Sequence, residues 1–296
     1  MDEYKYYKAA DIADAVKALN EAGGKAIVLA GGTDVMVDVN HGRLDRGYTF
    51  VYIGDVPGLS DISESGGVLE IGCLATASQI LESSLVQKKA SALWLAAKGL
   101  GGPQVRNRAT IGGNIMTANP SGDFIPALIA LGAEAKVESG GKRVKVEAIP
   151  TGVKKTSLAS DEIITGIDVP LSGARQGSAF VKIGKRKAMT ISVANAAVWV
   201  ELDEGGETVK DVRIAVGCCA PTVVRIKSLE AALTGAAVAS LPELSMQPAE
   251  GEIKPRTSKR ATMWYRSEIV PVLIQRAVMK AVAIANGADP SEEVAE

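Results

Sequence analysis

The segment RNRATIGGNIMTANPSGD, residues Arg106–Asp123, decides how this chain is interpreted. Two adjacent glycines, Gly112 and Gly113, follow a short apolar step, and a Pro-Ser-Gly-Asp turn closes the segment. Glycine lets the backbone come within hydrogen-bonding distance of a ligand and gives access to positive φ. Consecutive N–H groups in such a turn form a concave site for an anion. The segment therefore predicts a phosphate-binding loop.

A second glycine loop of the same kind stands upstream at Leu29–Asp34, with the sequence LAGGTD. It follows Lys25–Ala30, a β-branched apolar run that we expect to be a buried strand. Two such loops in one domain indicate a pyrophosphate-bearing cofactor more specifically than either loop alone. Neither loop carries the GxGxxG fingerprint or the Walker lysine pattern, so the two commonest phosphate-loop folds are excluded.

Polar side chains accompany both loops. Thr33 and Thr110 each add a hydroxyl, and Asn114 adds a carboxamide that can bond a ribose or a phosphate. Asp123 fits two roles, as an acceptor for ribose hydroxyls or as the N-cap of an apolar helix over 123–131. The pattern alone leaves both roles open.

Cationic side chains near the loops also allow two interpretations. Arg106 and Arg108 flank the central segment and could pair with phosphate or with a partner subunit. The basic run Lys182–Lys187 could neutralise a phosphate or a ring carbonyl, although charge runs are usually solvated surface.

The amino-acid composition limits the classes of function that are compatible with this chain. The chain has 296 residues, of which 47% are hydrophobic and 23% charged, as in a globular protein with a real core and two or more domains. A net charge of −1 and 4% aromatics argue against nucleic-acid binding. No apolar run approaches the length of a membrane span, and the N-terminus is polar, so we expect a cytoplasmic protein.

Metal chemistry in this chain is not expected. The three cysteines, Cys73, Cys218 and Cys219, form no CxxC pair and no disulfide framework. The single histidine, His41, lies in a loop without ligand spacing, which favours a solvated turn residue over a metal ligand or a catalytic base.

The order of expected elements indicates an α+β fold. Strands are expected at Tyr48–Ile53, Val68–Gly72, Ala133–Glu138, Arg143–Val146 and Asp161–Val169, and after a boundary at Leu171–Gly177 at Ser178–Ile183, Ser192–Leu202 and Thr208–Val216. Helices are expected at Ala10–Ala22, Thr76–Leu85, Ser91–Lys98, Asp123–Leu131, Ser228–Leu233 and Ser267–Asn286. The last three strands predict an antiparallel sheet, and residues 287–296 a frayed tail.

Several ordered motifs resemble one family. LAGGTD, ATIGGN, the following Asn-Pro-Ser-Gly-Asp and DEIIT near residue 161 resemble the FAD-binding medium subunit of molybdenum hydroxylases, of the xanthine dehydrogenase and carbon monoxide dehydrogenase type. The C-terminal segments FVKIGKRKAMTISVANAA, VRIAVGCCAPTVVR and MWYRSEIVPVLIQRAV are similar to that family too. The resemblance covers about residues 4–285.

The resemblance implies a two-part FAD-binding domain of the vanillyl-alcohol-oxidase-like (PCMH) type at 1–172, divided near residue 54. A C-terminal α+β domain would follow at 177–286. The loop Leu29–Val35 would wrap the FAD pyrophosphate. Thr76 would lie in a third contacting loop, and Ile164 would lie against the isoalloxazine. Lys182 would lie near the flavin or its phosphate, with Lys185 and Lys187 as competitors. The implied FAD contacts are Val28, Leu29, Ala30, Gly31, Gly32, Thr33, Asp34, Val35, Thr76, Thr110, Gly113, Asn114, Ser121, Asp123, Ile164 and Lys182.

Departures from the family pattern lie away from these contacts. Cys218 and Cys219 replace small apolar residues, Ser258 stands where an aspartate is common, and Ala9 or Ala10 stands where a proline is usual. The cysteine-bearing loop of some benzoyl-type reductases is absent, because no cysteine lies between 74 and 217. These departures concern the substrate subgroup rather than the fold.

The resemblance implies an electron-transfer subunit. A separate molybdenum subunit would hydroxylate the substrate, and a two-cluster [2Fe-2S] subunit would deliver electrons to the FAD of this chain. From there they would pass to NAD(P)+, a quinone or another acceptor, in a complex such as a dimer of heterotrimers. The implied electron transfer requires no catalytic acid or base in this chain. The alternatives are a flavin-free assembly or scaffold protein and a stand-alone FAD oxidoreductase.

Overall fold

The N-terminal end of the chain forms a small lobe around a parallel sheet. The computed structural model describes residues 3–186 and 188–292. Strands β1 (Lys5–Lys8), β2 (Ala26–Leu29) and β3 (Thr49–Tyr52) pair in the order β1-β3-β2. Helix α1 (Ile12–Glu21) follows β1, and α2 (Val35–Asn40) follows β2. Asp11 caps α1 by accepting the N–H of Asp14, which explains where that helix begins.

A five-stranded antiparallel sheet forms the middle of the molecule. Its order is β4-β5-β10-β6-β7, and the strands are β4 (Ile62–Ser65), β5 (Val68–Gly72), β6 (Glu134–Val137), β7 (Lys142–Lys145) and β10 (Ile164–Pro170). The predicted hairpin of β6 and β7 is confirmed. The short pair β8 (Pro150–Gly152) and β9 (Lys155–Thr156) and the 3-10 turns at Ser139–Gly141 and Val146–Ala148 complete this part.

Helices between β5 and β6 cover the middle sheet. They are α3 (Ala77–Glu82), α4 (Ser84–Lys89), α5 (Ser91–Gly99), α6 (Pro103–Arg106), α7 (Ile111–Thr117) and α8 (Phe124–Leu131). Every residue of α8 is buried, because this helix packs between the middle sheet and the C-terminal sheet. A helix that is apolar all round must be enclosed on all sides, and α8 meets that condition.

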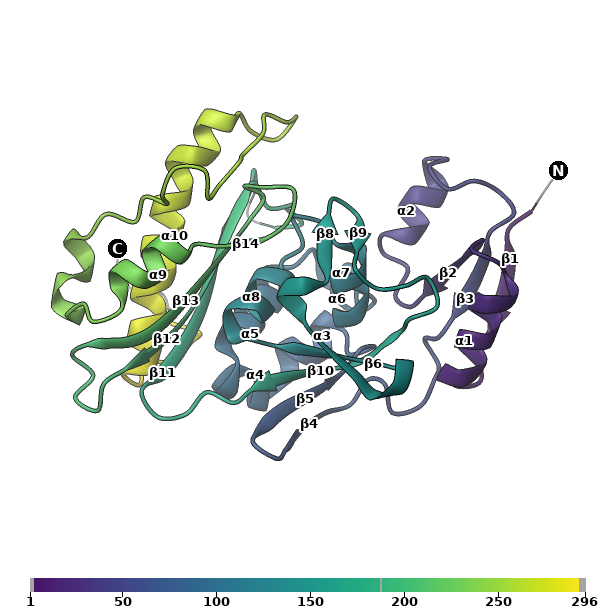
Figure 1. Ribbon diagram of the computed structural model, residues 1–296, viewed down its shortest axis with the longest axis horizontal. Helices are drawn as coiled ribbons and strands as arrows, with labels where there is room; N and C mark the ends of the chain where they lie inside the picture. The colour runs from purple at the N-terminus through teal and green to yellow at the C-terminus, as the bar shows by residue number, and fades with distance from the viewer. Residues whose placement is uncertain (1–2, 187, 293–296) are drawn as a thin grey trace.

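The C-terminal part is an antiparallel sheet covered by a long helix. Its order is β11-β12-β13-β14, with β11 (Gln176–Ile183), β12 (Ala194–Leu202), β13 (Val209–Gly217) and β14 (Val224–Arg225). Helix α10 (Met263–Ala285) crosses one face, opposite α5 and α8, as Figure 1 shows at the end of the molecule far from the N-terminal lobe. Helix α9 (Lys227–Leu233) and a 3-10 segment, Val238–Glu243, complete it. Strand β12 is therefore buried on both faces, which explains its alanine- and valine-rich sequence.

We expect Gly177→Ala to destabilise the protein, because α10 lies unusually close to β11 at this residue. A Cβ on Gly177 would lie 2.2 Å from the carbonyl oxygen of Ala281 and 2.5 Å from the backbone N of Ala285. Backbone atoms cannot rotate away, so we expect a loss of about 1–3 kcal/mol in the free energy of unfolding, measured by urea denaturation. Gly173→Ala is the matched control, because its Cβ would meet only the side chain of Gln176, at 3.8 Å. Equal stabilities of the two variants would contradict this packing.

The structure corrects several predicted elements. Strand β2 is half-buried rather than buried, because one side of it borders a cavity. The single helix predicted at Thr76–Leu85 is two helices, because Ser83 is extended and its side chain caps α4. Helix α10 begins earlier than predicted, because Thr262 caps it by accepting the N–H of Tyr265. Strands β1 and β4 were not predicted.

No helix within the described residues is long and apolar enough to cross a bilayer. The tail predicted to fray at 287–296 includes residues 293–296, which lie outside the described residues.

Candidate functional site

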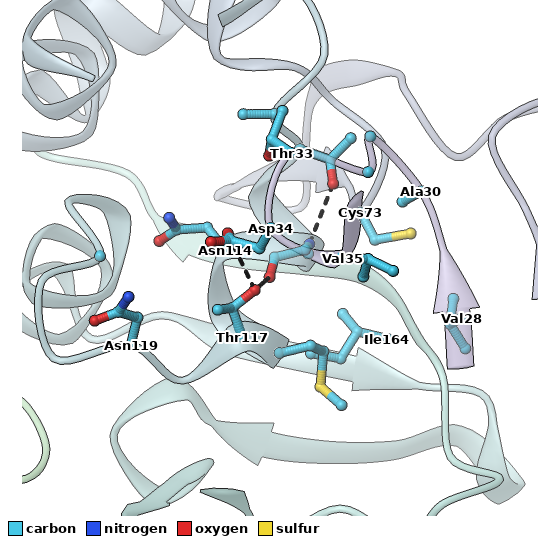
Figure 2. A pocket seen from close by; sticks show the side chains of 18 of the residues that line it. Val28, Ala30, Thr33, Asp34, Val35, Cys73, Asn114, Thr117, Asn119 and Ile164 are labelled. Atoms are coloured by element: carbon cyan, nitrogen blue, oxygen red, sulfur yellow. Dashed lines mark hydrogen bonds between the residues drawn. The ribbon is translucent and has the colours of Figure 1, made fainter. Parts of the chain in front are cut away.

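A cavity of about 690 Å³ lies where the N-terminal lobe meets the middle of the molecule. The loop after β2, the beginning of α7, the 156–164 segment before β10, and Met189–Ile191 all contribute to its walls. Figure 2 shows Thr33 and Asp34, from the loop after β2, and Asn114, from α7, among the residues that line this cavity. Segments far apart in the sequence thus form one site.

The loop Gly31–Val35 presents free backbone donors to the cavity. Among the described residues, no acceptor takes up the N–H groups of Gly31 through Val35, and all five residues line the cavity. The φ of Gly32 is +73°, a conformation that L side chains rarely adopt. A Cβ on Gly31 would lie 1.8 Å from the carbonyl oxygen of Arg108, so this glycine lets the two glycine segments meet. The predicted anion cradle is therefore available in this first loop.

The second glycine segment is not a loop, which corrects the sequence interpretation. Thr110 is the N-cap of α7, and its Oγ accepts the N–H of Gly113. The N–H groups of Ile111 and Gly112 bond the carbonyl oxygens of Ala75 and Cys73. These N–H groups are therefore bonded within the protein and are not available to a ligand. The segment contributes a helix and its side chains rather than a second cradle of N–H groups.

The two glycines of α7 have different roles. A Cβ on Gly112 would lie 2.8 Å from the Cβ of Cys73, so Gly112 packs against the protein. A Cβ on Gly113 would meet only the Oγ of Thr110 within 4 Å, and Gly113 lines the cavity. The absence of a side chain at Gly113 therefore leaves space in the cavity itself.

Helix α7 is joined to the first loop by polar contacts. The hydroxyl of Thr117 donates to the carbonyl of Gly113 at 2.8 Å and lies 3.4 Å from a carboxylate oxygen of Asp34, as Figure 2 shows. The Oδ1 of Asn114 is buried and has no hydrogen-bond partner. Because buried polar atoms are almost always paired, this oxygen is suited to accept from a hydroxyl of a bound ligand.

Asp123 ties the cavity wall to the C-terminal sheet. Asp123 occupies the N-cap position of α8, as one interpretation predicted, but its side chain makes no cap bond to the helix. Its Oδ2 accepts from the Nζ of Lys182 at 2.6 Å, and its Oδ1 accepts from Ser192 at 2.6 Å and Asn195 at 3.2 Å. The side chains of Asp123 and Lys182 are only 7% and 11% exposed. This is a buried ion pair between α8 and β11.

Most of the predicted contact residues do line the cavity. They are Val28, Ala30, Gly31, Gly32, Thr33, Asp34, Val35, Thr110, Gly113, Asn114, Ser121, Asp123 and Ile164. Leu29, Thr76 and Lys182 do not. Thr76 is instead the N-cap of α3, in a capping box with Gln79, and Lys182 is held by Asp123. Their predicted contacts with a ligand stay predictions.

Other lining residues were missed by sequence reasoning. Thr117 lies four residues after Gly113 on the same helix face, so helical spacing could have identified it once α7 was recognised as a helix. Met189–Ile191 gave no local signal, because tertiary packing alone brings them to the cavity. Cys73 also lines it, and burial raises the pKa of its thiol to about 12, so it is neutral at physiological pH.

The walls of the cavity carry no Lys or Arg side chain among the described residues. Arg106 donates to the carbonyl oxygen of Leu100, and Lys185 donates to that of Lys259. Lys187, the third predicted candidate for a flavin-side lysine, lies outside the described residues. A phosphate in this cavity would therefore be bound by backbone N–H groups rather than by cations.

His41 is exposed at the end of α2, where its ring nitrogen lies 2.8 Å from the carbonyl oxygen of Val37. The part of the chain that the structure describes contains no group of three or more His, Cys, Asp or Glu side chains that could hold a metal ion.

Two family models match the chain. The FAD binding domain in molybdopterin dehydrogenase matches residues 2–172, and the CO dehydrogenase flavoprotein C-terminal domain matches residues 179–281. The chain belongs to this flavoprotein family. It is an oxidoreductase subunit with an FAD-binding domain, as the sequence motifs predicted, and the predicted α+β fold is confirmed. The domain boundaries predicted near 172 and 177 stay a prediction.

The similarity to known proteins extends along nearly the whole chain. The xanthine dehydrogenase FAD-binding subunit of Escherichia coli O157:H7 is 33% identical over 97% of this chain and 98% of its own length. The carbon monoxide dehydrogenase medium chain of Hydrogenophaga pseudoflava is 30% identical over 95% of this chain and 97% of its own. A chain of the crystal structure of Cu,Mo-CO dehydrogenase superposes with a TM-score of 0.88 at 27% identity, over 96% of this chain and 99% of that chain. The chain is thus similar to FAD-carrying medium subunits of molybdenum hydroxylases.

Proposed function

We propose that this chain is the FAD-carrying electron-transfer subunit of a molybdenum hydroxylase complex. The observation that carries the proposal is the row of free N–H groups at Gly31–Val35, which lies in the same cavity as the unpaired buried oxygen of Asn114. A pyrophosphate is bound by N–H donors such as those of the loop, and the hydroxyl groups of FAD are bound by acceptors such as the oxygen of Asn114. The residues present therefore fit the cofactor that the family binds.

Roles for individual residues follow from their positions. Gly31–Val35 would bind the pyrophosphate, while Asn114, Ser121 and Asp123 would accept from or donate to the sugar and ribityl hydroxyls. Ile164, which is 3% exposed in β10, would pack against the isoalloxazine. When bound, FAD supplies the capacity to take up and release electrons. The protein residues hold the cofactor and exclude water.

The proposed partners follow from the relatives. Names such as "FAD-binding subunit" and "medium chain" describe parts of multi-subunit enzymes. We infer that a small subunit with two [2Fe-2S] clusters delivers electrons to this chain, and that a large molybdopterin subunit hydroxylates the substrate. The acceptor would be NAD(P)+, a quinone or another oxidant, and the complex a cytoplasmic dimer of heterotrimers or a similar assembly. A flavin-free scaffold is disfavoured, because the free N–H groups and the unpaired oxygen of the cavity match the groups that FAD presents.

Purification of the chain alone provides the direct test. We expect a yellow protein with a flavin absorption spectrum, and about one FAD released per chain on denaturation. Reconstitution with FAD should restore the spectrum of any apoprotein. A colourless protein that cannot be reloaded with FAD would refute the proposal and favour the scaffold alternative. Oxidation of a small substrate by the FAD-loaded chain alone would instead favour a stand-alone oxidoreductase.

A further inference from the structure

A second, smaller pocket lies beside the cavity and has a different character. Its volume is about 280 Å³, and it shares Asn119 and Ser121 with the large cavity. Its other walls come from the segment Lys254–Arg260, the beginning of α10 and the end of β13. Four cationic side chains line it, and no Asp or Glu does. The large cavity has the opposite composition, with carboxylates and no cation.

Arg266 lines this pocket and has no carboxylate partner among the described residues. The residue is 8% exposed and lies in the first turn of α10. Its Nη1 donates to the carbonyl oxygen of Cys218 at 2.5 Å and its Nη2 to the Oγ of Ser258 at 2.9 Å. Its Nε is buried and has no hydrogen-bond partner. No carboxylate lies within 4 Å of the guanidinium among the described residues.

Arg266 differs from the other charged side chains that are buried in the described part of the chain. The buried carboxylates of Asp123, Asp168 and Glu230 are each paired with at least one cation. A buried charge without a partner is costly, and proteins ordinarily pair it or use it. Arg266 is therefore a buried cation to which the described residues supply no carboxylate partner.

The neighbouring cations add to the positive charge of the pocket. Lys254, Arg256 and Arg260 are exposed, line the pocket, and form no ion pair with the described residues. Cations brought together repel one another, and a bound anion would relieve this repulsion. A single carboxylate would compensate one of them. A phosphate or pyrophosphate carries more charge and accepts hydrogen bonds from several guanidinium groups at once.

We propose that the pocket around Arg266 is an anion site that binds a phosphate or pyrophosphate group of a soluble ligand. The site is separate from the N–H groups of Gly31–Val35 and does not require FAD for its chemistry. The ligand could be free pyrophosphate or the diphosphate of a nucleotide, because both present the same group. Its position beside the cavity places this ligand next to the proposed cofactor.

The test measures pyrophosphate binding by calorimetry on the full chain saturated with excess FAD. The wild type should bind about one pyrophosphate per chain, and the affinity should fall steeply as salt is added. Ser258→Asp places a carboxylate against the guanidinium, so we expect at least a tenfold loss of affinity. Ser258→Asn has nearly the same shape without the charge and should stay within about threefold of the wild type. ADP should compete with pyrophosphate, and tighter binding of ADP would identify a nucleotide as the source.

Two results would overturn the proposal. One is the absence of saturable binding by the wild type, and the other is equal affinity in wild type and Ser258→Asp. Unfolding is not an alternative explanation, because Ser258→Asp gives Arg266 a partner and should leave the melting temperature unchanged or raise it. Arg260→Ala, at an exposed position, provides a second variant that should weaken binding and reduce its salt dependence. Pyrophosphate that binds at the Gly31–Val35 loop instead would be displaced by FAD and would not respond to Ser258→Asp.

Discussion

Replacing Gly113 with valine is expected to reduce the FAD content of the purified protein at least tenfold. The Cβ at this position meets only the Oγ of Thr110, at 2.8 Å, and the two methyl groups beyond it would extend into the cavity. The side chain would occupy the space into which the cofactor must fit. The displaced hydroxyl of Thr110 would also weaken the cap of α7, which costs about 1 kcal/mol. Flavin absorbance per chain after gel filtration gives the direct measurement.

The controls separate loss of the site from loss of the fold. Gly113→Ala adds only the Cβ and should retain more FAD than the valine variant. Gly205→Val lies in the turn between β12 and β13, where a Cβ would have ordinary contacts at 3.8 Å or more, and should retain all of it. Circular dichroism of the apoproteins should show a native fold for each. Stoichiometric FAD in Gly113→Val would count against the assignment of α7 to the cofactor site.

Asp123→Asn is expected to cost about 3–5 kcal/mol in the free energy of unfolding, because it leaves Lys182 as a buried cation without a counter-charge. The change keeps the shape of the side chain but removes the charge that the Nζ of Lys182 contacts at 2.6 Å. Urea denaturation of the apoprotein measures the effect without any contribution from cofactor binding. The loss should be accompanied by weaker attachment of β11 and β12 to the wall of the cavity.

Two further variants test the electrostatic cause. Adding Lys182→Met to Asp123→Asn removes the unpaired charge and should restore a substantial part of the stability. Asp55→Asn makes the same chemical change in an exposed pair with Lys8, whose side chains are 53% and 59% exposed, and should cost far less than Asp123→Asn because water screens the pair. A similar loss in the free energy of unfolding at both aspartates would show that burial of the Asp123–Lys182 pair does not increase its contribution to stability.

Gly113 and Asp123 support the protein through different physical effects. Gly113 acts through the space that it leaves, so its replacement should affect the cofactor more than the fold. Asp123 acts through its charge and connects α8 to the C-terminal sheet, so its replacement should affect the fold even without the cofactor. Comparing FAD content and unfolding free energy in both variants distinguishes these roles.

The sequence by itself determined the features that depend on local pattern. The strand before Gly31-Gly32, the hairpin of β6 and β7, the antiparallel strands β11 to β13 and the long helix α10 follow from the spacing of apolar residues and from turn residues. The motifs LAGGTD and ATIGGN also identified the family. These signals lie within short windows, so they can be interpreted without knowing the packing.

The tertiary structure alone decided which groups meet. The first N–H groups of α7 bond the carbonyl oxygens of Ala75 and Cys73 instead of facing a ligand, and no local pattern records that contact. Asp123 pairs with Lys182, 59 residues away, instead of capping its own helix. The fold brings the carbonyl of Cys218 and the hydroxyl of Ser258 to Arg266, and no carboxylate from the described residues. Partners of a charge or a donor are chosen by the packing of distant segments, whereas periodicity and turn chemistry are properties of neighbouring residues.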